Sequence, residues 1–233
     1  MTQVIDLKTV EKNILLNVLD EYPLMDSLNI ANIIENMIYQ EVEEYYDNRT
    51  LKSKYTLRFG EKEGLYQEWL ENGQKSMECT HKEGKLEGIY QRWWNNGQKS
   101  MECTFRDGKQ EGIIQEWWDN EQKRIECTFR DGKKEGLYQE WYENGNKDVE
   151  RTYKDDDKRD GLFQKWNENG NKWAECSFKD DKLEGLYQEW YANGNKDVEC
   201  TYKDHKRNGQ YQKWDIYGIR MIELTYKDGE ITK

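Results

Sequence analysis

The stretch EGLYQEWYENGN at residues 135–146 decides the fold, because it recurs almost unchanged as EGLYQEWYANGN at residues 184–195. Each copy is followed by a second run rich in aromatic and β-branched residues, KDVERTY at 147–153 and KDVECTY at 196–202. Two such runs joined by a turn that contains Asn-Gly are typical of a β-hairpin. The sequence therefore predicts one hairpin in each copy.

This hairpin motif recurs along the chain, and each repeat opens with a glycine that we number as position 0. Position 3 is Gln, position 5 is Trp and position 14 is Glu in every repeat. We therefore predict a mainly β fold, an elongated single-layer antiparallel β-hairpin solenoid over residues 51–233, with a short α-helical segment in residues 1–50. The seven opening glycines are Gly64, Gly88, Gly112, Gly136, Gly161, Gly185 and Gly209.

The length of the hairpin turn predicts which residues share a face of the sheet. A three-residue loop with Gly in its left-handed third position pairs position 5 with 11, 3 with 13 and 1 with 15. The apolar residue at position 1, Gln at 3 and Trp at 5 then share a face with apolar position 13, Cys at 15 and the aromatic at 17. The other face carries the charged residue at 4, Glu at 14, Thr at 16, and the aromatics at 2 and 6. In repeat three Glu121 replaces the turn glycine, so either Glu121 is left-handed or the turn changes type.

The first fifty residues differ from the repeats in pattern and in charge. They carry 3 basic and 10 acidic residues, and apolar residues at helical spacing predict helices over residues 7–21 and 26–46, separated by Pro23. We expect this acidic helical pair to cover the open first edge of the sheet, since an uncovered edge invites aggregation. Residues 54–60 look like the second strand of a degenerate repeat before the first.

Composition excludes several classes of partner. The net charge of −11 argues against a nucleic-acid partner and disfavours binding to an anionic membrane. No stretch approaches the ~20 apolar residues of a membrane span, and the first residues resemble no signal peptide. We therefore predict a cytoplasmic protein, in the host cytoplasm or the virion if the source is viral, whose 5 Cys are reduced.

The cysteines and histidines form no pattern with catalytic or metal-binding spacing. Equivalent positions in consecutive hairpins are two strands, about 9.6 Å, apart, which is too far for a disulfide or a shared zinc ion. His81 and His205 have no regular Cys, Ser or Asp companion that would make a general base. We therefore predict a protein that is not an enzyme, with no metal and no cofactor, and small core cysteines at Cys79, Cys103, Cys127, Cys176 and Cys200.

Two aromatic positions are predicted to form an exposed strip that binds a partner. Large aromatics at position 6 concentrate in repeats two to four, and the tyrosines at position 2 fall on the same charged face. Exposed aromatic clusters are interaction sites, and Trp and Tyr dominate binding hot spots. The alternatives are that the strip covers neighbouring strands or packs against another copy of the chain. The predicted partner-binding residues are Trp94, Trp118, Tyr142, Tyr191, Tyr90, Tyr138 and Tyr187.

The repeats resemble the MORN-repeat variant, in the form EGLYQEWYENGN followed by YKDGK and EG, over roughly residues 51–233. The resemblance implies an elongated single-layer β-hairpin array that serves as a scaffold or binding module. Related arrays occur in bacterial antitoxin-type proteins and in giant viruses of amoebae. The predicted function is therefore a non-enzymatic protein–protein interaction scaffold with a protein partner.

Two other functions stay open. Residues 14–19 together with 28–30 resemble the start of an F-box without its opening Leu-Pro, which implies an adaptor that recruits a ubiquitin ligase through the N-terminal helices. The MORN family name is also attached to peripheral phospholipid binding, although the net charge of −11 speaks against an anionic surface.

Overall fold

The computed structural model describes residues 38–154 and 157–232, and the chain divides into two compact units, residues 1–85 and 86–233. The predicted helix over residues 7–21, most of the one over 26–46 and the F-box-like run all lie outside the described residues. Among those that are described, no helix is long and apolar enough to cross a membrane.

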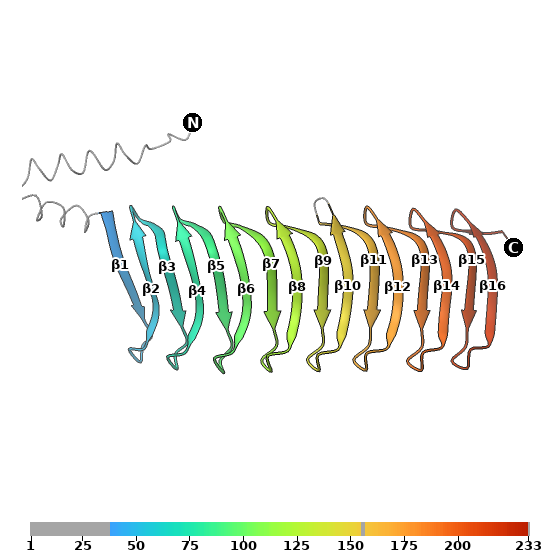
Figure 1. The fold of residues 1–233 in the computed structure, drawn as a ribbon, viewed down its shortest axis with the longest axis horizontal. Coiled ribbons are helices and arrows are strands. Elements are labelled where there is room, and N and C mark those ends of the chain that lie inside the picture. Colours follow the sequence, from blue (N-terminus) through green and yellow to red (C-terminus); the bar gives the residue numbers. More distant parts are fainter. Residues whose placement is uncertain (1–37, 155–156, 233) are drawn as a thin grey trace, which may run out of the picture. The chain divides into compact units, whose positions relative to one another are not determined.

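Almost every described element is a β-strand (Figure 1). The first unit holds β1 (Tyr39–Tyr45), β2 (Leu51–Arg58), β3 (Glu61–Trp69) and β4 (Lys75–Lys82). The strands that follow are β5 (Lys85–Trp93), β6 (Lys99–Arg106), β7 (Lys109–Trp117), β8 (Lys123–Arg130), β9 (Lys133–Trp141), β10 (Lys147–Lys154), β11 (Lys158–Trp166), β12 (Lys172–Lys179), β13 (Lys182–Trp190), β14 (Lys196–Lys203), β15 (Lys206–Trp214), β16 (Arg220–Lys227) and β17 (Glu230–Ile231).

Within each unit, every strand pairs antiparallel with the next one along the chain. This holds from β1 to β4 in the first unit and from β5 to β17 in the second. The predicted antiparallel array of hairpins is therefore confirmed.

The first hairpin corrects one prediction and confirms another. The helix predicted over residues 26–46 is wrong at its end, because Tyr39–Tyr45 forms β1 and pairs with β2, with Val42 opposite Tyr55. Backbone pairing along this edge outweighs the helical spacing of the apolar residues, as tertiary context often does. The predicted second strand of a degenerate repeat is confirmed by β2.

A β-bulge in each hairpin changes the predicted faces. Trp141 at position 5 pairs with Lys147 at position 11 as predicted, but the register then shifts by one residue, so that Gln139 pairs with Glu150 and Tyr138 with Arg151. The predicted pairs 3 with 13 and 1 with 15 are wrong, since the bulge places an extra residue opposite the strand end. Position 3 instead faces 14, position 2 faces 15 and position 1 faces 16, as in β3 and β4.

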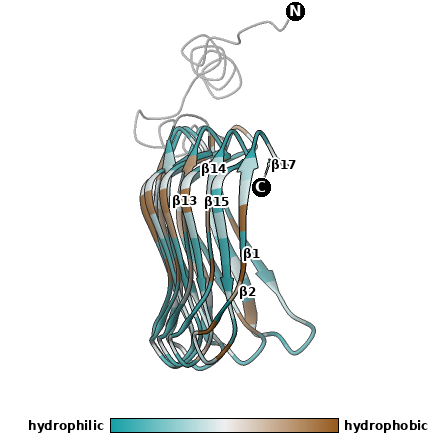
Figure 2. Ribbon diagram, turned by 90° about the vertical axis from the view of Figure 1, so that its right-hand side faces the viewer, coloured by the Kyte–Doolittle hydropathy of each residue, from teal (hydrophilic) through white to brown (hydrophobic). Residues whose placement is uncertain are grey.

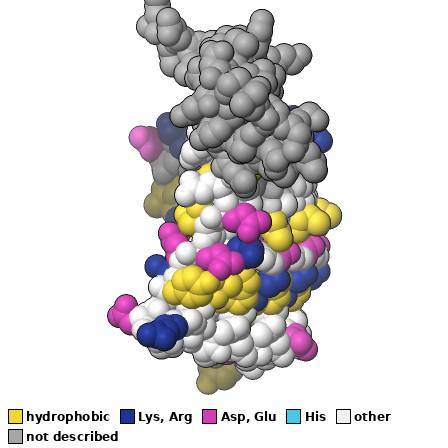
Figure 3. Space-filling model, turned by 90° about the vertical axis from the view of Figure 1, so that its left-hand side faces the viewer, with side chains coloured by type: hydrophobic (Ala, Val, Ile, Leu, Met, Phe, Trp, Pro, Cys, Tyr) yellow, Lys and Arg dark blue, Asp and Glu magenta, His cyan; other side chains and the backbone are white. Residues whose placement is uncertain are grey.

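The two faces of the sheet therefore carry different side chains from those predicted. We call the face with positions 2, 4, 13, 15 and 17 the cysteine face, and the face with positions 1, 3, 5, 14 and 16 the tryptophan face. Apolar segments recur at matching heights on successive strands of the second unit (Figure 2). At the end of the first unit, a band of hydrophobic side chains lies beside charged ones (Figure 3).

The core lies on the cysteine face and consists of cysteine, aliphatic and aromatic side chains. Cys103 and Cys127 are 1% and 4% exposed and cluster with Ile114 and Tyr138. All five cysteines are buried as free thiols, which confirms that they are core residues. Among the described residues, the side chains that are most completely enclosed by their neighbours are small ones, namely Cys103, Cys200 and Ser53.

The turn of repeat three gives a testable prediction about stability. Glu121 has φ of 66°, where the equivalent turn residues are Gly73 and Gly145 with φ of 82° and 83°; the left-handed prediction is confirmed. Glu121→Gly should relieve a strain of roughly 1 kcal/mol, offset by about 0.4–1 kcal/mol from the freer unfolded chain. We expect a small gain in the urea midpoint, and a clear loss would contradict this account of the turn.

Candidate interaction surfaces

A polar ladder runs across the tryptophan face. In repeat four, Gln139 Nε2 donates to Glu150 Oε2 at 2.7 Å, and Lys147 Nζ donates to the same oxygen at 2.5 Å. The Lys147 ammonium lies over the ring of Trp166 in the next repeat, with Nζ 5.5 Å from the ring centre. The same Gln–Glu contact occurs at Gln67–Glu78, Gln91–Glu102, Gln115–Glu126, Gln164–Glu175 and Gln188–Glu199. The glutamates at position 14 therefore form hydrogen bonds with other side chains of the sheet.

Because of this ladder, the stability of the folded chain should depend on pH in the acid range. The Lys147 ammonium and the Gln139 amide hold the pKa of Glu150 below its ordinary value of 4.5. The unfolded chain therefore binds more protons than the folded chain as pH falls below about 4.5, so the contribution of Glu150 is present above that pH and is lost below it. In Glu150→Gln we expect the urea midpoint to fall less steeply between pH 5 and pH 3 than in the wild type. Glu143→Gln in the exposed turn is the control, and equal slopes in all three proteins would contradict the prediction.

A row of exposed aliphatic side chains follows position 1 on the tryptophan face. In the second unit the members of this row are between 43% and 60% exposed. Each lies opposite a small hydroxyl residue at position 16 of the neighbouring strand, as Leu137 does opposite Thr152. Sequence reasoning missed this row because it placed position 1 on the packed face, although Gln210 in the last repeat shows that a polar residue is accepted there. The row is Ile89, Ile113, Leu137, Leu162 and Leu186.

The aromatic residues at position 6 join each hairpin to the next. Trp118 Nε1 donates to the carbonyl oxygen of Trp141 at 3.0 Å, and the Tyr142 hydroxyl donates to that of Trp166 at 3.0 Å. Trp94 and Tyr191 make the equivalent bonds, to Trp117 and Trp214. All four are half-buried, so they cover neighbouring strands, which is one of the alternatives stated for the strip.

The tyrosines at position 2 belong to the core. Tyr138 is 7% exposed and packs edge-to-face on Tyr153, with ring centres 5.9 Å apart. Tyr90 and Tyr187 are half-buried against Phe105 and Tyr202. The prediction that positions 2 and 6 form one exposed strip is therefore wrong, because the bulge brings positions 15 and 17 onto the same face as the tyrosines. Whether these seven residues bind a partner stays a prediction.

The repeats that carry these contacts match a known family. The family model described as MORN repeat variant matches residues 86–107, 134–155, 159–180 and 183–204. This chain is a MORN-repeat protein. A search of the curated proteins gives no match.

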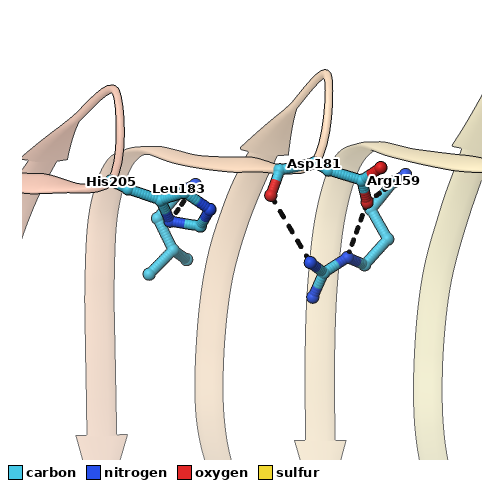
Figure 4. Close-up of polar contacts among 4 residues, drawn as sticks. All are labelled: Arg159, Asp181, Leu183 and His205. Atoms are coloured by element: carbon cyan, nitrogen blue, oxygen red, sulfur yellow. Dashed lines mark hydrogen bonds and ion pairs between the residues drawn. The ribbon is translucent and has the colours of Figure 1, made fainter.

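Consecutive MORN repeats are also linked at the turns between hairpins. The Asp181 carboxylate accepts hydrogen bonds from Arg159 N and Nε at 3.1 and 3.0 Å, and His205 Nδ1 accepts one from Leu183 N at 3.1 Å (Figure 4). Asp181 N and His205 N donate in return to the carbonyl oxygens of Arg159 and Leu183. Both turn residues have positive φ, and each closes a two-way link with the repeat before it.

The described part of these MORN repeats contains no group of three or more His, Cys, Asp or Glu residues that could hold a metal ion. Burial raises the pKa of the Cys103 and Cys127 thiols to about 11. A thiol with so high a pKa is a poor nucleophile at neutral pH, because the thiolate is the reactive form.

Proposed function

We propose that this MORN-repeat protein is a non-enzymatic protein-interaction scaffold that binds its partner through the aliphatic row of the tryptophan face. Its repeats are of a kind consistent with a binding or scaffold module. The observation that carries the proposal is that five Leu and Ile side chains stand 43–60% exposed in register along one face. Contiguous exposed apolar patches mark interaction sites in soluble proteins.

The surroundings of the row favour a protein over an anionic lipid surface. In repeats one to six the lysine at position 11 is paired with the glutamate at position 14, as Lys123 is with Glu126 at 2.7 Å, so the charges of these lysines are already neutralised. The side chains opposite the row are threonine or serine. An apolar centre with a polar, neutral border is the composition of a protein–protein interface. The net charge of −11 disfavours an anionic bilayer.

The row can be tested with substitutions that the chain already contains. Ile113→Gln, Leu137→Gln and Leu162→Gln copy Gln210 at the same position of the last repeat, so the triple variant should fold. Lys179→Gln, Lys203→Gln and Lys227→Gln, three exposed residues at one equivalent position, make the matched control. The wild type, the Gln triple variant and the control variant are each cross-linked in native cells, and the proteins attached to them are identified by mass spectrometry.

We expect one or more proteins to be cross-linked to the wild type and the control variant but lost from the Gln triple variant. Identical sets of proteins from a folded triple variant would remove the aliphatic row from the proposal. Absence of any protein above background for the wild type, together with co-sedimentation with anionic liposomes, would overturn the scaffold function itself.

A further inference from the structure

A hollow of about 290 Å³ lies between repeats three and four, on the opposite face from the aliphatic row. Trp118 and Tyr142 form its aromatic walls, and Ile125 lies among its apolar lining. Glu140 and Asp148 bring two carboxylates to it, and Trp141 also lines it. Arg124 brings one guanidinium, which lies 4.9 Å from the centre of the Trp118 ring. The hollow thus combines aromatic rings with acidic groups, which is the combination that recognises a cation.

The aromatic walls are fixed by the fold. Trp118 and Tyr142 each donate a hydrogen bond of 3.0 Å to a backbone carbonyl of the next repeat. Burial and the Asp148 carboxylate raise the pKa of Tyr142 to about 12, so its hydroxyl stays protonated and keeps this bond. Rings held in place before binding cost little conformational entropy when a ligand arrives.

One carboxylate oxygen in the hollow has no hydrogen-bond partner among the described residues. Glu140 is paired with Arg151, at 3.3 Å, and Arg124 with Glu116, at 3.6 Å. Asp148 Oδ1 is buried yet has no hydrogen-bond partner among the described residues. A buried carboxylate oxygen without a partner is costly. A second hollow lined by Tyr142 adds the carboxylates of Glu143 and Glu168, so the surroundings are acidic.

The chain itself shows which group fits against this carboxylate. Asp197 is the equivalent of Asp148 two repeats further on, and its Oδ1 also has no hydrogen-bond partner among the described residues. It differs in having an ion pair, because the Lys213 ammonium of the following repeat lies 3.7 Å from that oxygen. The residue equivalent to Lys213 beside Asp148 is Lys165, which pairs opposite Val149 as Lys213 does opposite Val198. The Lys165 ammonium lies instead over the ring of Trp173, 5.6 Å from its centre. The contact with Trp173 thus keeps the Lys165 ammonium from pairing with Asp148 as Lys213 pairs with Asp197.

We propose that the hollow between Trp118 and Tyr142 binds the Arg or Lys side chain of a basic segment in a partner protein. The cationic group would lie against the Tyr142 ring and pair with Asp148, while Arg124 keeps its place over the Trp118 ring. This site is independent of the aliphatic row, and the acidic net charge of the chain attracts a basic segment over a distance.

The probe is a fluorescently labelled Gly-Ser peptide with three arginines, titrated by fluorescence anisotropy against the full chain at low salt. In a matched peptide, citrulline replaces arginine. We expect Asp148→Asn to weaken binding of the arginine peptide by about tenfold, the loss of a hydrogen bond to a charged group. Asp197→Asn should leave binding unchanged, because the Lys213 ammonium already forms an ion pair with Asp197.

A second variant tests the site without altering any residue that lines it. Trp173→Ser, which copies Ser76 and Ser100 at the same position, should free Lys165 to approach Asp148 and so weaken binding of the peptide. Equal affinity of the citrulline and arginine peptides would overturn the proposal. So would equal losses in Asp148→Asn and Asp197→Asn, because binding would then follow overall charge. If Asp148→Asn fails to fold, Tyr142→Asn, which copies Asn167, carries the same test.

Discussion

Replacing Tyr138 by Ala is expected to lower the free energy of unfolding by about 3 kcal/mol, within the usual range for removing a buried aromatic ring. Tyr138 is 7% exposed. Its ring contacts Tyr153 edge-to-face, and the Arg151 guanidinium lies 4.4 Å from its centre. Removal of the ring therefore opens a cavity next to Cys127 and leaves Arg151 with only one of its two ring contacts, the one with Tyr153.

The neighbouring residue is the matched control. Leu137 is 47% exposed on the opposite face, and its replacement by Ala should change the free energy of unfolding by less than about 0.5 kcal/mol, as is usual for surface positions. Urea unfolding followed by circular dichroism measures both. The register predicted from the turn alone would reverse the two results, because it places position 1 in the core and position 2 on the surface. A larger loss for Leu137→Ala than for Tyr138→Ala would therefore contradict the observed register.

The repeat predicts the hairpins, but it does not predict their faces. Counting alternate residues from the turn assumes that each residue of one strand opposes one residue of the other. The bulge at position 12 breaks this assumption in every repeat, and every residue beyond it changes its partner. One signal was present: position 12 is Ser76, Arg124, Asp148, Trp173 or Met221 in different repeats, a variety that suits an unpaired residue better than a packed one.

The first strand was missed for a related reason. Tyr39–Tyr45 contains few apolar residues, and Val42 and Tyr45 fit the end of a helical pattern as well as they fit a strand. What decides between the two is the edge of β2, to which β1 supplies backbone partners. Such a contact between segments is not encoded in the local spacing of apolar residues.

The acidic hollow depends on side-chain directions that the sequence does not specify. Trp118 and Tyr142 were predicted to bind a partner, but as members of a strip that included Tyr138, and the structure buries Tyr138 in the core. Asp148 and Asp197 differ in that the Lys165 ammonium lies over Trp173 while the Lys213 ammonium lies near Asp197, and Trp173 is two strands away from Asp148.

The opening glycines give the second large effect, and Gly161, like Gly209, combines a large positive φ with a close threonine. It has φ of 107°, and a Cβ added to it would lie 2.6 Å from Thr152 Oγ1. Gly185 has φ of 82°, with nothing within 4 Å of an added Cβ. Gly185→Ala therefore carries only the backbone strain of positive φ, about 1–2 kcal/mol. Gly161→Ala adds a steric clash to a less favourable φ, and we expect a loss of about 3 kcal/mol or more.

A double-mutant cycle separates the clash from the backbone strain. Thr152→Ala removes the hydroxyl that an alanine at 161 would meet, so in that background the cost of Gly161→Ala should fall toward that of Gly185→Ala. The difference between the two backgrounds is the coupling energy of the pair, and contacting residues commonly show 0.5–3 kcal/mol. Urea midpoints of the four proteins of the cycle, with Gly185→Ala alongside, measure it. If Gly161→Ala costs the same with and without the Thr152 hydroxyl, then backbone conformation alone requires glycine at the start of this repeat, and the close approach of Thr152 has no part in it.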